Sequence, residues 1–286
     1  MKYNYMKKTR SLDLLLKNEK RLQENLELVD LVLEVLDARL PAISRNPQLQ
    51  KMLGNKKRII VLNKSDLAEK EMTGCWLNYL AGGKWPVLGF NAKRRTEVIK
   101  LERLVDSLRP ETVKFKRSFR MMVVGIPNVG KSTILNRLLQ RYVARTGNTP
   151  GITRGAQWIK LRHDLDLLDT PGFLSPFLRN EKSILSLGAI GSLSHGAYDM
   201  ETAACWLVDQ FLAREKTKRI IEKLYMVHGE VAGGLKSSYE LLADIGAARG
   251  CYKKGAELDI LKTSQVLLSD FRRGTLGPIT LESPQL

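Results

Sequence analysis

The stretch GIPNVGKST (residues 125–133) decides the fold expected for this chain of 286 residues. It has the spacing GxxxxGKS, follows the apolar run MMVV (residues 121–124) and precedes a segment with helical periodicity. Glycines let the backbone approach a phosphate closely, and a helix N-terminus offers unpaired N–H groups and a partial positive charge. Because a strand and a helix both flank the motif, it predicts a phosphate-binding loop (P-loop) and not a chance glycine-rich turn.

Two side chains of the P-loop have defined roles in such a motif. Lys131 reaches the β- and γ-phosphates of a bound nucleotide, and Ser132 places its hydroxyl on Mg²⁺. Lys131 is therefore also a catalytic candidate. The nucleotide contacts expected from this loop lie at Asn128, Val129, Gly130, Lys131, Ser132 and Thr133.

The tetrapeptide NKSD (residues 63–66) lies about sixty residues before the P-loop and predicts a guanine-reading loop. The Asp66 carboxylate can accept hydrogen bonds from guanine N1–H and from the exocyclic amine, a donor pair that adenine lacks. The Lys64 stem would stack on the base, and Asn63 would tie this loop to the P-loop. Alone, the tetrapeptide is equally compatible with a capped strand-to-helix turn, but a P-loop in the same chain favours the nucleotide.

Three further motifs complete the expected site. The tripeptide NAK (residues 91–93) places Asn91 and Ala92 at the base, where the Ala92 N–H can donate to guanine O6. The last two motifs are DTPG (residues 169–172) and TPGITR (residues 149–154).

DTPG and TPGITR are the candidates for metal and γ-phosphate contacts. Asp169 offers a carboxylate to the Mg²⁺ shell, and Gly172 offers an N–H to the γ-phosphate. The Thr153 hydroxyl would complete the metal shell when a triphosphate is bound, which makes Thr153 a second catalytic candidate. A plain Thr/Pro turn is the alternative for TPGITR, but five motifs in fitting contexts are not expected by chance.

The arrangement of strand-like and helical segments predicts two domains. Over residues 1–174 buried apolar runs alternate with helical segments, and the motif loops follow the runs directly, as ligand loops do in open α/β sheets. This predicts an α/β domain with a mostly parallel sheet. Residues 175–286 show helical periodicity with few strand signals, which predicts an all-α domain. The strands expected from the sequence lie at residues 28–36, 58–62, 86–90, 121–124, 157–161 and 165–169.

The charge of the chain indicates a polyanionic partner. Its formal net charge is +17 and its pI about 9.8, and +16 of that charge lies in residues 1–174. Lys and Arg bind phosphates and release their counterions, so nucleic acid is the expected partner. A well-solvated basic surface is the alternative.

Apolar runs and cysteines point to a cytoplasmic protein. The longest runs, such as residues 28–36, are far shorter than the roughly 20 residues that cross a bilayer, so we expect no membrane span. The first residues lack the apolar stretch of a secretory signal. Cys75, Cys205 and Cys251 are odd in number and widely spaced, which predicts reduced thiols rather than a disulfide framework or a zinc site.

The order of the motifs, with the guanine-reading loop before the P-loop, resembles that of circularly permuted GTPases of the ribosome biogenesis GTPase A (YlqF/RbgA) family. The resemblance covers nearly the whole chain. Permutation leaves the sheet and the site intact, but it places DTPG next to the second domain, where a γ-phosphate signal could pass directly. The other matching stretches are VLDARLPAISRNP (residues 35–47), TGNTPGITR (146–154), LLDTPG (167–172), RGC (249–251) and KKG (253–255).

The resemblance implies a P-loop NTPase fold with an all-α C-terminal domain, binding of GTP and GDP with Mg²⁺, and GTP hydrolysis. It implies a monomer that acts late in assembly of the large ribosomal subunit, with its C-terminal domain on ribosomal RNA. Asn128 matches the Asn that helps hold K⁺ in potassium-activated relatives. Basic candidates for RNA contacts are Arg249, Lys253, Lys254, Arg272 and Arg273.

Neither familiar group that positions the attacking water is present, and one of them is a departure from the family. Members carry Gly-His-Met near the N-terminus, whereas residues 4–6 here read NYM and no His precedes His163. Phe173 follows DTPG, where many GTPases have a water-orienting Gln; here the chain is similar to family members, which also carry a hydrophobic residue. We therefore expect slow intrinsic hydrolysis, near the ~10⁻⁴ per second of an unassisted small GTPase. The three His residues are expected to be ordinary structural or surface residues.

Two alternatives remain open at this point. The first is a nucleotide-gated RNA-binding scaffold with little hydrolysis. The second is a permuted GTPase of the small subunit, although those carry zinc-binding Cys/His clusters or an added RNA-binding barrel, which this sequence lacks. The sequence does not separate a bacterial from an organellar compartment.

Overall fold

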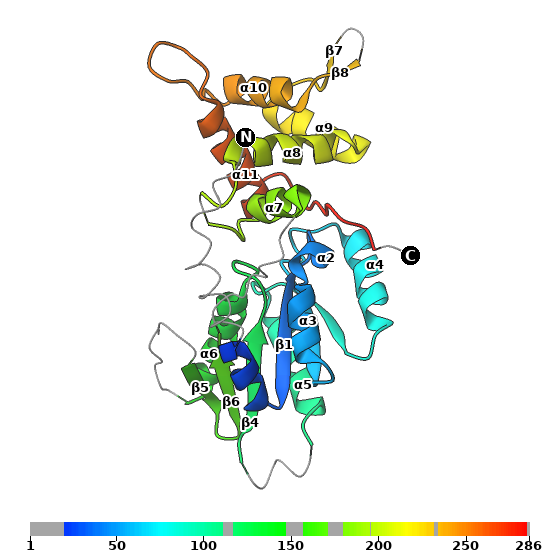
Figure 1. Cartoon of the computed structure of the whole chain (residues 1–286), viewed down its shortest axis with the longest axis vertical. Helices are drawn as coiled ribbons and strands as arrows, with labels where there is room; N and C mark the ends of the chain where they lie inside the picture. Colours follow the sequence, from blue (N-terminus) through cyan, green and yellow to red (C-terminus); the bar gives the residue numbers. More distant parts are fainter. Residues whose placement is uncertain are drawn as a thin grey trace.

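The computed structural model describes residues 20–110, 117–146, 157–170, 180–194, 196–231 and 234–284. Figure 1 shows two bodies stacked along the long axis, an α/β domain below and a helical domain above. The α/β domain contains a six-stranded sheet in the order β3-β2-β1-β4-β6-β5. Its strands are β1 Leu31–Asp37, β2 Arg58–Asn63, β3 Val87–Phe90, β4 Phe119–Val124, β5 Gln157–Arg162 and β6 Leu165–Asp169.

The sheet is parallel except for β5, which pairs with β6 as an antiparallel edge. Every residue of β1 is buried, as expected for a central parallel strand that is covered on both faces. The register aligns Asp37 with Asn63 and Asn63 with Phe90, so the strands end together. The predicted mostly parallel sheet is thereby confirmed. Its first strand begins three residues later than expected, at Leu31.

Helices cover both faces of this sheet. One face of β1 packs its Leu31, Leu33 and Val35 in a core shared with α5 and α6. Val32 on the other face packs in a core with the helical segment 20–27 and α3. The helices of this domain are α2 Pro41–Ser44, α3 Pro47–Leu53, α4 Lys70–Ala81, α5 Arg95–Ser107 and α6 Lys131–Thr146.

The C-terminal body is helical, with α8 at its centre in contact with α7, α9, α10 and α11. A two-stranded ribbon, not expected from the sequence, joins α9 to α10. The domain boundary predicted between residues 174 and 175 lies outside the described residues, and it stays a prediction. The elements are α7 Glu181–Ala189, α8 Met200–Leu212, α9 Glu215–Tyr225, β7 Glu230–Val231, β8 Gly234–Leu235, α10 Ser238–Ala248 and α11 Ile260–Arg273. Among the described residues, no helix is long and apolar enough to span a bilayer.

The C-terminal tail (residues 275–284) returns to the α/β domain and holds the two bodies together (Figure 1, red). The Leu281 N–H donates to the Arg39 carbonyl at 2.9 Å. The Glu282 carboxylate accepts from the N–H groups of Ala42 and Ile43 at 2.7 and 3.2 Å, and its carbonyl accepts from Trp76 Nε1 at 3.1 Å. The last residues of the described chain therefore contribute to the docking of the two domains.

The Glu282 contact predicts a pH-dependent stability. Burial raises the pKa of Glu282 to about 7, although the two N–H groups and Lys182 favour the ionised form. Between the ordinary pKa of a glutamate and about 7, Glu282 is therefore protonated in the folded state and ionised in the unfolded state. The free energy of unfolding consequently falls as pH rises from 5 to 8. In Glu282→Gln that fall should be smaller by about 2 kcal/mol, measured by urea unfolding across this range.

The matched control is Glu257→Gln, which removes an exposed carboxylate of the helical domain and should retain the wild-type slope. Identical pH slopes for Glu282→Gln and the wild type would contradict the assignment.

Candidate functional site

The predicted motif loops meet at the carboxyl edge of the sheet. The NKSD loop follows β2, the NAK loop follows β3 and the P-loop follows β4. The Ser65 N–H donates to the Phe90 carbonyl at 3.1 Å, which joins the first two loops. Asp169, the last residue of β6, ends at the same edge.

The P-loop requires glycine at two positions. Gly125 has φ +151°, and a Cβ there would lie 2.4 Å from the Val35 carbonyl oxygen. Gly130 has φ +99°, and a Cβ there would lie 2.1 Å from Asn63 Nδ2. A side chain at position 125 would collide with the backbone, and one at position 130 would be strained by its φ and would displace Asn63. The loop then leads directly into α6 at Lys131, so the N–H groups of the first turn face the loop.

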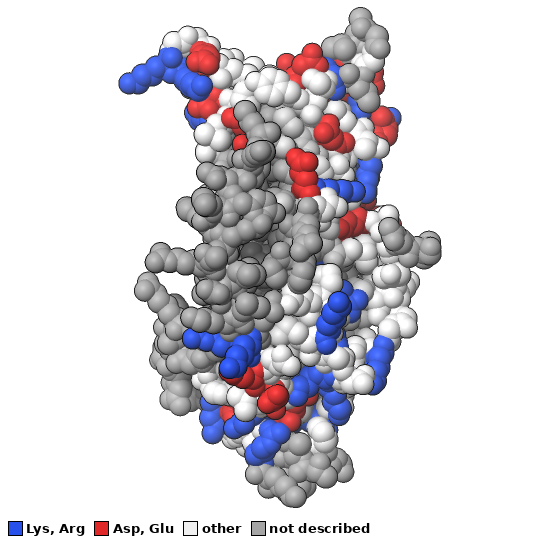
Figure 2. All heavy atoms as spheres, in the orientation of Figure 1, with Lys and Arg blue, Asp and Glu red and all other residues white. Residues whose placement is uncertain are grey.

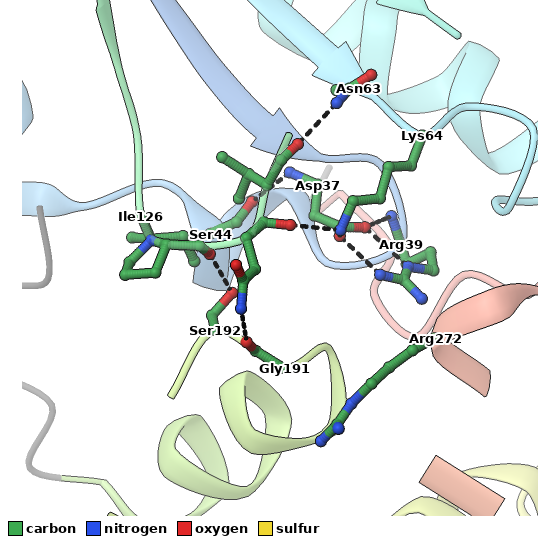
Figure 3. Close-up of polar contacts among 12 residues, drawn as sticks. Asp37, Arg39, Ser44, Asn63, Lys64, Ile126, Gly191, Ser192 and Arg272 are labelled. Atoms are coloured by element: carbon green, nitrogen blue, oxygen red, sulfur yellow. Dashed lines mark hydrogen bonds and ion pairs between the residues drawn. The ribbon is translucent and has the colours of Figure 1, made fainter. Parts of the chain in front are cut away.

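The guanine-reading loop and the P-loop are in direct contact (Figure 3). Asn63 Nδ2 donates to the Val129 carbonyl at 2.7 Å, and Lys64 Nζ donates to the Asn128 carbonyl at 2.6 Å. Lys64 has φ +60°, a rare conformation for a side-chain-bearing residue that aims it across the loop. Two segments far apart in sequence thus form one surface.

Lys131 and Asp169 interact electrostatically at the carboxyl edge of the sheet. Lys131 Nζ donates to the Ile126 carbonyl at 2.8 Å. Burial lowers the pKa of Lys131 to about 8, against the opposing effect of Asp169. Burial likewise raises the pKa of Asp169, and Lys131 opposes that shift. A bound polyphosphate would place negative charge beside Lys131 and so favour its protonated form.

Asp66 lies at the rim, beside the NAK loop. Its carboxylate pairs with Lys93 Nζ at 2.8 Å, with exposed side-chain fractions of 22% for Asp66 and 73% for Lys93. Such an exposed pair contributes little free energy, so a base can displace the lysine. Asn91 and Ala92 are buried, and Asn91 Oδ1 accepts from the Lys93 N–H, which holds the NAK turn.

The residues present fit a hard divalent cation. Ser132 and Asp169 supply a hydroxyl and a carboxylate, the oxygen donors that Mg²⁺ prefers together with phosphate oxygens and water. Among the described residues, no group of three or more His, Cys, Asp and Glu could hold a metal. Thr153 and Gly172, predicted to join this shell, lie outside the described residues, as do Phe173 and residues 4–6.

A buried ion-pair cluster adjoins the NKSD loop and was not predicted from the sequence motifs. The fully buried Asp37 carboxylate accepts from Arg39 Nε and Nη2 at 2.9 and 2.8 Å and from Lys64 Nζ at 2.9 Å. Arg39 Nη1 donates to the Phe271 carbonyl of α11 at 3.1 Å, and the guanidinium lies 4.9 Å from the Phe271 ring centroid. The available signal was an Asp and an Arg directly after a buried strand.

Electrostatics explains why this cluster is ionised. Burial opposes the charge on Asp37, but Arg39 and Lys64 hold its pKa well below the usual range. Burial lowers the pKa of Lys64, and Asp37 opposes that shift. The lysine of the guanine-reading loop is therefore fixed by a carboxylate that is also bound to the helical domain through Arg39.

Comparisons with known proteins agree with a nucleotide site of this geometry. A family model described as 50S ribosome-binding GTPase matches residues 120–231. Ribosome biogenesis GTPase A of Bacillus licheniformis is 34% identical, over 94% of this chain and 95% of that protein. The chain belongs to the ribosome biogenesis GTPase A family. The family member of Thermotoga maritima is 29% identical over 94% of this chain and 92% of that protein.

Solved structures of the family have the same fold. A GDP-bound YlqF structure superposes with a TM-score of 0.69 at 26% identity, covering 92% of this chain and 99% of that one. A GNP-bound YlqF from T. maritima gives 0.67 at 26% identity, with 94% and 99% covered. The predicted fold, a circularly permuted P-loop GTPase domain with a helical C-terminal domain, is confirmed, and the chain is a GTPase. The roles of individual site residues stay predictions.

Among the basic candidates for RNA contacts, Arg272 is engaged inside the protein. Its Nε donates to the Ala189 carbonyl at 3.0 Å, and its Nη2 donates to the Gly188 carbonyl at 2.7 Å. Arg249 is exposed and pairs with Asp270 at 2.6 Å. Lys253, Lys254 and Arg273 are exposed as well.

Proposed function

We propose that this GTPase acts in late assembly of the large ribosomal subunit, as a cytoplasmic monomer that binds ribosomal RNA. The observation that carries the proposal is the contact between the guanine-reading loop and the P-loop, in a chain of this family. Relatives are named for ribosome biogenesis, and the matching family model is described as 50S ribosome-binding. The description of the family model supports the large subunit over the small one.

In the proposed binding mode, the P-loop N–H groups and Lys131 hold the phosphates, while Asp66 reads the base. Ser132 and Asp169 would hold Mg²⁺, which supplies charge neutralisation at the β- and γ-phosphates. Asn128 Nδ2 donates to the Gly191 carbonyl, so the amide oxygen is the atom that would face K⁺. Thr153 and Gly172 are proposed to join the γ-phosphate contacts.

Surface charge supports an RNA partner. Figure 2 shows Lys and Arg gathered over the α/β domain, whereas Asp and Glu make up more of the charge over the helical domain. This agrees with the net charge of +17, most of it in the first domain. We therefore propose that RNA contacts extend onto the α/β domain and include Lys253, Lys254 and Arg273 of the helical domain.

The test is steady-state GTP hydrolysis with Mg²⁺ in K⁺ or Na⁺, with and without ribosomal particles. We expect turnover near ~10⁻⁴ per second for the protein alone, because neither a His before residue 163 nor a Gln after DTPG is present. Precursors of the large subunit should accelerate it, more in K⁺ than in Na⁺. Lys131→Met is the control for contaminating GTPases. Acceleration by small-subunit particles only, or by neither, would contradict the proposal.

The missing water-positioning groups also favour a second candidate, a nucleotide-gated RNA scaffold with little hydrolysis. Single-turnover phosphate release on large-subunit precursors separates the two. Intact GTP binding without phosphate release would support the scaffold.

A further inference from the structure

Side chains from outside the P-loop donate hydrogen bonds to its backbone carbonyl oxygens and fix their direction. The Asn128 carbonyl accepts from Lys64, and the Val129 carbonyl accepts from Asn63. In a trans peptide, C=O and the following N–H point in opposite directions. No peptide bond described by the structure is cis. Fixing these two carbonyls therefore directs the next two N–H groups, of Val129 and Gly130, toward the opposite side.

The carbonyl before these two is held in the same way, but from the helical domain. The Ser192 hydroxyl donates to the Pro127 carbonyl at 2.8 Å (Figure 3). The peptide plane of this carbonyl contains the Asn128 N–H, which must then point away from Ser192. Ser192 is only 2% exposed, so water does not compete for the bond. Its neighbour Gly191 accepts from the Asn128 side chain.

The loop that carries Ser192 (residues 190–194) is itself fixed. The Ser192 N–H donates to the Leu187 carbonyl at 2.8 Å, and Gly191 has φ +76°, so the chain turns sharply after α7. Arg272 of α11 binds the Gly188 and Ala189 carbonyls at the C-terminal end of α7, where a cation is favourable. The loop is therefore anchored to the helical domain before it reaches the P-loop.

We infer that Ser192 is a positioning residue of the nucleotide site: the helical domain supplies one of three donors that orient successive P-loop peptides toward the phosphates. The inference rests on the nucleotide binding proposed above. By linkage, a nucleotide that needs this orientation strengthens the contact between P-loop and helical domain by the same factor. Nucleotide binding is thus coupled to the helical domain through the 190–194 loop, by a route separate from DTPG.

The test is the affinity of Ser192→Ala for fluorescently labelled GDP, measured by titrating the protein into the labelled nucleotide in the presence of Mg²⁺. Loss of the hydroxyl frees the Pro127 carbonyl, and we expect affinity to fall about fivefold, the effect of one typical hydrogen bond. The matched control is Ser186→Ala. Ser186 is also fully buried, but its hydroxyl donates to the Lys182 carbonyl within α7, so GDP affinity should not change.

Hydrogen exchange gives a readout that a purely structural role would not move. In the wild type, GDP should slow exchange in the 190–194 loop, and in Ser192→Ala this slowing should be reduced. Equal GDP affinity of Ser192→Ala and wild type, or an equal loss in Ser186→Ala, overturns the inference. If the wild type itself does not bind GDP, the proposed function fails instead, so the two failures are distinguishable.

Discussion

Asp66→Asn should weaken GDP binding about a thousandfold and shift the preference of the site toward xanthine nucleotides. The carboxylate accepts from two donors of guanine, and each hydrogen bond to a charged group contributes roughly 1.5–3 kcal/mol. The substitution replaces one acceptor oxygen by an NH₂ group that faces the exocyclic amine of guanine. A site built for a donor pair rejects the mismatched partner by a large factor.

Xanthosine diphosphate is the informative ligand, because it has a carbonyl oxygen where guanine has the exocyclic amine. The introduced amide can donate to that oxygen, so Asp66→Asn should bind xanthosine diphosphate more tightly than GDP, whereas the wild type prefers GDP. The control is Lys93→Ala, which removes the exposed partner of Asp66 and leaves the carboxylate. Its GDP affinity should stay within about twofold, since exposed ion pairs contribute little. An unchanged base preference in Asp66→Asn would refute guanine reading by this loop.

Much of the α/β domain could be predicted because its signals are local. Buried runs end in polar motifs, and parallel strands that end together bring those motifs to one edge. This is why the contact of Asn63 with the P-loop was expected from the sequence. The antiparallel direction of β5 was not, since it depends on a tight turn at residues 163–164 that carries no glycine or proline.

The contacts between the domains could not be predicted in this way. Ser192 lies in a loop whose composition is typical of a surface turn. Nothing near it in the sequence indicates that its hydroxyl donates to the Pro127 carbonyl. Arg272 looked like a solvated cation suited to RNA, but packing of α11 against α7 directs it to backbone carbonyls. Such roles are set by tertiary packing between segments tens of residues apart, which periodicity and motif spacing do not encode.

Asp37 also belongs to this class, and its replacement should have the largest effect on stability. Asp37→Asn removes the counter-charge of Arg39 while that arginine stays buried, and it removes one partner of Lys64. Breaking a buried pair on one side costs about 3–5 kcal/mol, because an uncompensated charge remains in the interior. Urea unfolding at pH 7 should show a loss of this size.

The pH dependence follows from the depressed pKa of Asp37. Its contribution is fully present above the ordinary pKa of an aspartate and is lost only as pH falls toward the lower folded value. The difference between Asp37→Asn and the wild type should therefore be constant from about pH 5 to 8 and shrink in stronger acid.

Asp30→Asn is the matched control for Asp37→Asn, because Asp30 lies at the other end of β1 and pairs with the half-exposed Arg117. Its loss should be about 1 kcal/mol, as for other exposed pairs. The double variant Asp37→Asn/Arg39→Met should regain part of the stability, since it removes the stranded cation as well. If Asp37→Asn costs no more than Asp30→Asn, or if the second substitution only adds to the loss, the buried cluster does not hold the charge balance described here.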